Sequence, residues 1–141
     1  MEFQRTEGKL STDILKEEFG AIRLDIVLRK GNLRTSCIRR VSDNAAVACS
    51  KVLFHDEGIK VFDQFHKDIL AGGKIGETIQ HSGVPHERIE SEFSQVRMDP
   101  DIISLFGTKR DVCMSRTVEY RIRSLPYASI TEFYNPEYAN F

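Results

Sequence analysis

The sequence predicts an α+β fold, in which helices pack against an antiparallel sheet of about six strands. Two observations predict this class. Segments in which apolar and polar residues alternate come as consecutive pairs joined by short turn sequences, which is typical of hairpins. A block of residues with helical spacing separates these pairs, whereas a parallel sheet would alternate strand and helix. The length of 141 residues suits one domain, so we expect a single domain over residues 1–141.

A short helix opens the predicted order of elements. Ile14 and Phe19 have helical spacing, and Gly20 stands where a left-handed residue commonly ends a helix. Ser11 and Thr12 are candidate N-caps, because their hydroxyl oxygens can accept a hydrogen bond from the free amides of the first turn. We therefore expect a helix that begins near Ser11 and ends at Phe19.

Three strands follow this helix. Residues 22–29 alternate apolar and polar side chains, and residues 30–32 form a turn signal. A second strand is expected over residues 33–41 and a third over residues 45–54. Residues 42–44 join them as a three-residue hairpin loop, because Asp and Asn tolerate left-handed conformations.

A loop centred on Asp43 sets the register between the second and third strands. It pairs Arg34 with Val52, Ser36 with Ser50, Cys37 with Cys49, and Ile38 with Ala48. The three cysteines are an odd number without CxxC spacing, which indicates a reduced, cytoplasmic protein. Cys37 and Cys49 are therefore interpreted as two small core residues in preference to a redox pair.

The second half combines helices with two closing strands. The predicted elements are helices over 59–71 and 76–81, an ambiguous stretch over 88–98, a helix over 99–106, and strands over 116–122 and 128–134. Asp99 followed by Pro100 is a strong helix start, because proline has no amide to leave unsatisfied in the first turn. Residues 123–126 are expected to join the two closing strands.

Charge and hydropathy narrow the classes of function. Lys and Arg total 20, Asp and Glu total 21, and the formal net charge is −1. A dedicated nucleic-acid binder usually carries a strongly basic surface, so we expect no nucleic-acid partner. No apolar run reaches the roughly 18–20 residues that a membrane-spanning helix needs, so we expect no membrane partner.

Several motifs of known chemistry are absent from the sequence. It has no GxxxxGKS, GxxxxGKT or GxGxxG phosphate loop, no HExxH zinc motif and no GxSxG nucleophile turn. None of the four histidines pairs with another at the spacing of metal ligands on a helix. We therefore expect neither a metal ion nor a cofactor.

Three charged residues stand on strand faces that are otherwise apolar. Arg34, Arg116 and Glu132 each alternate with apolar neighbours in a predicted strand. A charged side chain is rarely buried unless it is paired, because removing it from water is costly. The pattern leaves three interpretations open: a structural Arg–Glu pair inside the sheet, a pocket in which a guanidinium grips a ligand carboxylate, or strand ends in water.

Several segments, taken in order, resemble the chorismate lyase-like family, and especially its small chorismate pyruvate-lyase branch. The matching segments are the turn Glu7–Thr12, the strands Leu33–Ile38 and Ala48–Val52, the turn Lys74–Ile79, Arg88, the strand Arg116–Ile122, Pro126, and Ile130–Phe133. Together they cover nearly the whole chain, and their order agrees with the strands predicted from periodicity. The resemblance implies an antiparallel sheet, helices packed against it and a buried ligand pocket.

The resemblance also implies a set of site residues. The implied catalytic residues are Arg34, which would hold a substrate carboxylate, and Glu132, which would donate a proton or polarise the leaving group. The implied substrate-binding residues are Leu10, Ile75, Gly76, Arg88 and Arg116. Backbone amides in the Leu10 and Ile75 turns would attract an anion, because each turn opens a helix.

The activity that the resemblance implies is that of a cofactor-free carbon–oxygen lyase, which would cleave chorismate to 4-hydroxybenzoate and pyruvate. Two alternatives stay open. Relatives of the same family include the effector-binding (UTRA) domains of bacterial transcription regulators, which implies a non-catalytic domain that binds a small carboxylate. The other alternative is a lyase or isomerase that acts on another cyclic carboxylate. The expected partner is a small-molecule carboxylate, and the binding domain could also hold a sugar-like ligand in the same pocket.

Overall fold

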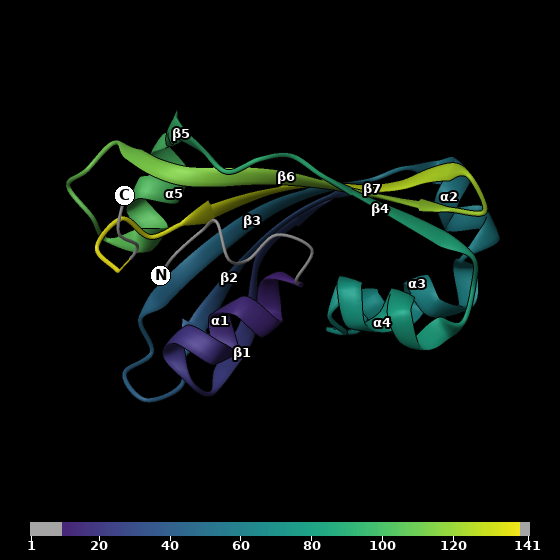
Figure 1. The fold of residues 1–141 in the computed structure, drawn as a ribbon, viewed down its shortest axis with the longest axis horizontal. Coiled ribbons are helices and arrows are strands. Elements are labelled where there is room, and N and C mark those ends of the chain that lie inside the picture. The colour runs from purple at the N-terminus through teal and green to yellow at the C-terminus, as the bar shows by residue number, and fades with distance from the viewer. Residues whose placement is uncertain (1–9, 139–141) are drawn as a thin grey trace.

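A computed structural model describes residues 10–138 of the chain (Figure 1). Its elements are α1 (Ser11–Phe19), β1 (Ile22–Lys30), β2 (Leu33–Arg40), β3 (Ala46–Phe54), α2 (Asp56–Val61), α3 (Asp63–Leu70), α4 (Ile75–Ser82), β4 (His86–Glu90), β5 (Ser94–Arg97), α5 (Pro100–Phe106), β6 (Val112–Ile122) and β7 (Leu125–Tyr134). The strands form one seven-stranded antiparallel sheet in the order β1-β2-β3-β7-β6-β4, with β5 also paired to β6. The predicted α+β class with an antiparallel sheet is confirmed.

The hairpin of β2 and β3 has the register that the sequence predicts. The observed pairs include Arg34 with Val52, Ser36 with Ser50, Cys37 with Cys49, and Ile38 with Ala48. A shift by one residue would turn the apolar side chains of a strand from the core to water. The alternation of the two strands and the short loop between them therefore determine this register.

The closing hairpin of β6 and β7 turns more tightly than predicted. Only Arg123 and Ser124 form the turn, with φ angles of 50° and 68°. A two-residue hairpin loop matches the twist of its strands when both central residues have positive φ. Pro126 already belongs to β7 and lies opposite Arg121, beside a shift of register. The predicted connection over residues 123–126 is therefore too long.

The predicted helix over residues 59–71 is replaced by two helices, α2 and α3, which meet at Phe62. Phe62 has a non-helical φ of −124° and is 1% exposed, with its ring centroid 5.0 Å from that of Tyr127. Gly58 lets α2 approach β7 closely, since a Cβ atom there would lie 2.4 Å from the carbonyl oxygen of Pro126. Packing against the core breaks the helix that local spacing favours.

The ambiguous stretch over residues 88–98 contains parts of two short strands. Both β4 and β5 pair along the same edge of β6, where Glu90 lies opposite Val118 and Ser94 lies opposite Ser115. The long strand β6 would otherwise leave its backbone donors and acceptors unpaired along that edge. The sheet therefore decides between helix and strand for this stretch.

The helices divide between the two faces of the sheet (Figure 1). Helices α1, α3 and α4 lie over one face, here called the front face, where Ile69 and Ile79 pack in one core with Val52 and Val118. Helix α5 covers one end of the opposite face, called the back face. Its cluster comprises Cys37, Ala46, Cys49, Met98, Ile102, Phe106, Cys113 and Phe133. Among the described helices, none is both long and apolar enough to cross a membrane.

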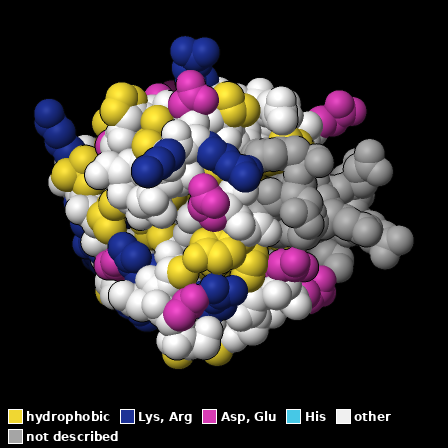
Figure 2. All heavy atoms as spheres, turned by 90° about the vertical axis from the view of Figure 1, so that its left-hand side faces the viewer, with side chains coloured by type: hydrophobic (Ala, Val, Ile, Leu, Met, Phe, Trp, Pro, Cys, Tyr) yellow, Lys and Arg dark blue, Asp and Glu magenta, His cyan; other side chains and the backbone are white. Residues whose placement is uncertain are grey.

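The end of the molecule that carries α5 has a surface of mixed charge. Figure 2 shows Lys and Arg side chains interspersed with Asp and Glu side chains there, around small groups of apolar atoms. The described residues on this face form no broad area of a single charge, in keeping with the net charge of −1 for the whole chain. This end therefore lacks the strong field that steers highly charged partners.

The structure joins Cys37 and Cys49 in a disulfide across β2 and β3, with their Cα atoms 4.2 Å apart. Their interpretation as two unpaired core residues is therefore wrong, although the prediction that they face one another is confirmed. Cys113 is free and buried in the cluster beneath α5. Burial raises the pKa of the Cys113 thiol to about 11, so the reactive thiolate is scarce near neutral pH.

We expect the thiols to report this pairing directly. Iodoacetamide should leave the folded protein unlabelled, because Cys113 is buried and the other two cysteines are joined. After unfolding without reductant, mass spectrometry should find one label per chain, and after reduction three. Three labels without reductant would contradict the disulfide.

Candidate functional site

A cavity of about 100 Å³ lies between the front face of the sheet and the helices α1 and α4. The start of α1 and the start of α4 line it from the helical side, through Leu10, Ser11, Thr12, Lys74, Ile75 and Gly76. The front face contributes inward side chains from β1, β2, β3, β4, β6 and β7, among them Leu24, Arg34, Ser50, Arg88, Val118 and Glu132. The cavity is thus built from segments that are distant in the sequence.

Most of the predicted site residues meet at this cavity. Six of the seven line it: Leu10, Arg34, Ile75, Gly76, Arg88 and Glu132. The seventh, Arg116, is not among the lining residues; its side chain is fully buried and its Nε lies 3.1 Å from a Glu132 carboxylate oxygen. The fold therefore brings six of these residues together at one cavity and leaves Arg116 buried beside Glu132.

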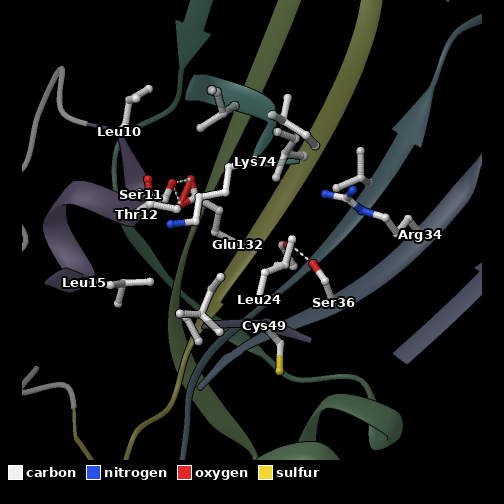
Figure 3. A pocket seen from close by; sticks show the side chains of 18 of the residues that line it. Leu10, Ser11, Thr12, Leu15, Leu24, Arg34, Ser36, Cys49, Lys74 and Glu132 are labelled. Atoms are coloured by element: carbon white, nitrogen blue, oxygen red, sulfur yellow. Dashed lines mark hydrogen bonds between the residues drawn. The ribbon is translucent and has the colours of Figure 1, made fainter. Parts of the chain in front are cut away.

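Arg34 reaches the cavity from β2 and is 5% exposed (Figure 3). Its Nε and Nη1 atoms are buried, and neither has a hydrogen-bond partner. The guanidinium carbon lies 5.7 Å from the centre of the Phe54 ring. Burial lowers the pKa of Arg34, and the positive charge of Arg29 lowers it further. Arg34 is therefore a buried cation whose donors are left available to a ligand.

Glu132 is the centre of a buried polar network on β7. Its carboxylate accepts hydrogen bonds from Ser11 Oγ at 2.5 and 2.6 Å, from the Tyr134 hydroxyl at 2.7 Å and from Arg116 Nε at 3.1 Å. Arg116 also donates to Glu90 through Nη1 at 3.0 Å. Burial alone lowers the pKa of Arg116, but Glu132, Tyr134 and Glu90 together outweigh burial and the net shift is upward. Both oxygens of Glu132 are therefore already engaged by the protein.

These contacts divide the three charged residues between two interpretations. Arg116 and Glu132 lie opposite one another on β6 and β7 and form a structural pair inside the sheet. Arg34 matches the pocket interpretation, because it is buried beside the cavity with open donors. The third interpretation, a position at a strand end in water, fits none of the three charged residues, because each of them is at most 5% exposed.

Two helix starts converge on the cavity. Leu10 precedes the first turn of α1, and Lys74 precedes the first turn of α4. The amides of a first helical turn lack partners within the helix and carry a partial positive charge, so they attract anions. Gly76 allows the close approach of α4, because a Cβ atom there would lie 2.9 Å from Leu10 and 3.0 Å from the Tyr120 hydroxyl.

Sequence analysis does not assign two residues at this site, Ser11 and Lys74. Ser11 is predicted as a helix cap, yet it makes no capping hydrogen bond and donates to Glu132 instead. Figure 3 shows Lys74 on the α4 side of the cavity, with its amine directed toward the start of α1. The position of Lys74 directly before the Ile75 turn was the signal available in the sequence. The Ser11 contact spans 121 positions and has no local signal.

Arg88 lies at the β4 side of the cavity and has protein partners. Its Nε donates to the Tyr120 hydroxyl at 3.2 Å, and its guanidinium pairs with Glu90. Tyr120 also lines the cavity, and burial raises its pKa. Arg88 therefore contributes positive charge to this wall while its geometry is held by its neighbours.

His66 is a buried histidine close enough to Arg34 to interact with its charge. The Nδ1 atom of His66 and the Tyr127 hydroxyl are 2.7 Å apart, in the core beneath α3. Burial lowers the pKa of His66, which therefore stays neutral in the folded protein at neutral pH. Burial also raises the pKa of Tyr127. The neutral pair adds no charge of its own beside Arg34.

We expect His66 to make the protein less stable in mild acid. The unfolded chain takes up this proton near pH 6.5, about the ordinary value for histidine, and the folded chain only at lower pH. The contribution of neutral His66 to the free energy of unfolding is complete above about pH 6.5. It is lost as the pH falls through the pKa of His66 in the folded protein. Urea titrations at several pH values should show that the free energy of unfolding depends less on pH in His66→Gln than in the wild type. The exposed His86→Gln variant should keep the wild-type slope, and equal slopes in all three would contradict the assignment.

Comparisons with known proteins identify the fold. No protein-family model and no curated protein matches the sequence. Gene product SA0254 from Staphylococcus aureus has a TM-score of 0.62 and 11% identity, covering 89% of this chain and 90% of that one. The C-terminal domain of the histidine utilization repressor from Pseudomonas syringae has a TM-score of 0.57 and 10% identity, covering 86% and 91%. The effector-binding domain of the Bacillus subtilis trehalose repressor has a TM-score of 0.50 and 9% identity, covering 92% and 85%.

These comparisons correct the predicted activity. The expectation that the chain is a carbon–oxygen lyase is wrong: the similar structures with a named function include the two repressors above and regulators of the GntR family. The site agrees with this correction, because Glu132, the implied proton donor, is held by Ser11, Tyr134 and Arg116. Of the resemblance described above, the similarity in fold to effector-binding domains is confirmed. The chain shares its fold with the effector-binding domains of transcription regulators.

Proposed function

We propose that this chain is a non-catalytic domain that binds a small carboxylate in the cavity between α1, α4 and the front face. One observation carries the proposal. Arg34 is 95% buried against the cavity while its Nε and Nη1 atoms have no hydrogen-bond partner. A buried cation without partners is costly, and an anion that enters the cavity removes that cost.

The chemistry of a guanidinium favours a carboxylate over other groups. The planar guanidinium presents parallel N–H donors that match the two oxygens of a carboxylate, and such charge-assisted bonds are stronger than neutral ones. The starts of α1 and α4 add partial positive charge at the helical side of the cavity. Lys74 adds a further positive charge there. Positive groups therefore flank the cavity on two sides.

The remainder of the cavity wall favours a compact apolar ligand body. Leu24, Val52, Val118 and Ile130 line the front face between the charged groups. The hydroxyls of Ser36 and Ser50 lie 3.0 Å apart in the same wall and can orient one polar substituent. A volume of about 100 Å³ suits a small ligand. These features together fit a single-ring or short-chain acid.

Isothermal titration calorimetry with a matched pair of probes tests this proposal. We expect 4-hydroxybenzoate to bind and 4-hydroxybenzamide, which has the same shape without the charge, to bind at least about tenfold more weakly. A thermal-shift panel of other ring and short-chain carboxylates covers acids of different size. Equal binding of the acid and the amide, or no binding of any acid in the panel, would contradict the proposal.

A further inference from the structure

Strand β1 contains a bulge in its pairing with β2. Ile26 lies opposite Ser36 and Leu28 lies opposite Thr35, so Val27 is an extra residue between two successive pairs. In an uninterrupted strand Leu28 would share the front face with Ile26, because the side chains of a strand alternate between its two faces. The bulge turns Leu28 to the back face, where it is 55% exposed. The strand thus leaves an apolar side chain in water that its alternation would otherwise cover.

The same bulge brings Arg29 beside Arg34. Arg29 is the residue opposite Arg34 in the pairing of β1 with β2, so both side chains lie on the front face. Directly opposite residues in an antiparallel pair have their Cβ atoms about 5 Å apart. Without the bulge, Leu28 would lie opposite Arg34 and Arg29 would belong to the back face. Bulges are common next to functional sites, where they re-aim a side chain.

Two arginines directly opposite each other are unfavourable when no anion lies between them. Like charges at this spacing destabilise a sheet, because they repel one another. Burial lowers the pKa of Arg34, and the positive charge of Arg29 lowers it further, so the two guanidinium groups interact. Nε and Nη1 of Arg34 have no hydrogen-bond partner, and Arg29 forms no ion pair with another described residue. Within the described part of the chain, the two positive charges are therefore not neutralised.

We infer that Arg29 is a second ligand-binding residue, which gives the site a preference for an acid with two carboxylates on neighbouring carbon atoms. Arg34 holds one carboxylate inside the cavity, and the exposed Arg29 holds the other at its edge. Two guanidinium groups on neighbouring strands can each form charge-assisted hydrogen bonds to one of these carboxylates. A single carboxylate leaves one of the two charges unbalanced. The inference rests on the proposed function and deepens it, because it names the class of acid.

Isothermal titration calorimetry with phthalate and benzoate tests the inference. The two acids share the same ring, and phthalate adds a second carboxylate on the neighbouring carbon atom. We expect the wild-type chain to bind phthalate at least about tenfold more tightly than benzoate, because only phthalate engages both arginines. Arg29→Gln should remove this preference while changing the affinity for benzoate less than about threefold. Arg29→Lys keeps the positive charge and should retain part of the preference.

Lys30→Gln is the matched control. Lys30 is exposed, follows Arg29 directly and lies opposite Leu33, so its side chain belongs to the back face. Its substitution removes the same charge and should leave the preference for phthalate unchanged. Circular dichroism confirms that each variant is folded.

Two results would overturn the inference and leave the proposed function standing. One is equal affinity of the wild-type chain for phthalate and benzoate. The other is a preference for phthalate that Arg29→Gln retains, since another group then holds the second carboxylate. Binding of neither acid would also overturn the inference, and the panel of other carboxylates then decides the proposed function separately.

Discussion

Replacing Arg34 by methionine should abolish binding of 4-hydroxybenzoate and raise the free energy of unfolding by about 1–3 kcal/mol. The two effects have one cause. Nε and Nη1 of the buried guanidinium are without hydrogen-bond partners, so the folded protein carries a desolvation cost that a bound anion offsets. Methionine is of similar length and is apolar, so it can keep the contact with Phe54 without that cost.

Urea unfolding and calorimetry measure the two effects of Arg34→Met separately. Arg121→Met is the matched control, because Arg121 is exposed on β6, and it should change neither the stability nor the affinity. If Arg34 had a structural role, its substitution would lower the free energy of unfolding of the protein. If Arg34→Met lowers the free energy of unfolding, the side chain supports the fold and the proposed role in binding is contradicted.

Replacing Glu132 by alanine should lower the free energy of unfolding by about 3–5 kcal/mol. The variant takes Glu132 from the fully buried Arg116 side chain, which keeps its ion pair with Glu90. It also takes an acceptor from the hydroxyls of Ser11 and Tyr134. Removing one partner of a buried ion pair is among the largest sources of instability in a folded protein. Chemical denaturation monitored by circular dichroism measures the loss.

A double variant separates the charge from the shape of this site. Combining Glu132→Leu with Arg116→Met removes both partners of the buried pair and should recover most of the stability that Glu132→Ala loses. Glu87→Ala, on the exposed side of β4, should have little effect and serves as the control. A loss as large in the double variant as in Glu132→Ala would show that packing, and not the loss of one partner from the buried ion pair, dominates.

The disulfide adds a local constraint close to the site. Cys49 lies on β3 between Ala48 and Ser50, which line the cavity, and its side chain is joined on the back face to Cys37 on β2, the strand that also carries Arg34. The bond therefore links two strands of the cavity wall. Reducing agents should accordingly be excluded from the first binding measurements, so that the wall is studied in the form described here.

The sequence by itself was sufficient where local pattern and loop length act together. Alternation over β2 and β3, with a short loop at Asp43, predicts the observed pairing of Ser36 with Ser50. The helix start at Pro100 and its end at Gly107, which has a left-handed φ of 64°, were likewise predicted from residue type. In each of these cases the interactions that decide the structure lie within a few residues of one another.

The sequence also indicates which charged residues leave the surface, but not what each of them meets. Arg34 and Arg116 have the same signal, an arginine within an alternating strand, yet Arg116 pairs with Glu132 while Nε and Nη1 of Arg34 face the cavity unpaired. A period of two specifies the face of a side chain and says nothing about its partner across the sheet. The strand order β2-β3-β7-β6 decides that difference, because it places Arg116 beside Glu132 and Arg34 two strands away from β7. Only the tertiary structure brings strands so distant in the chain together.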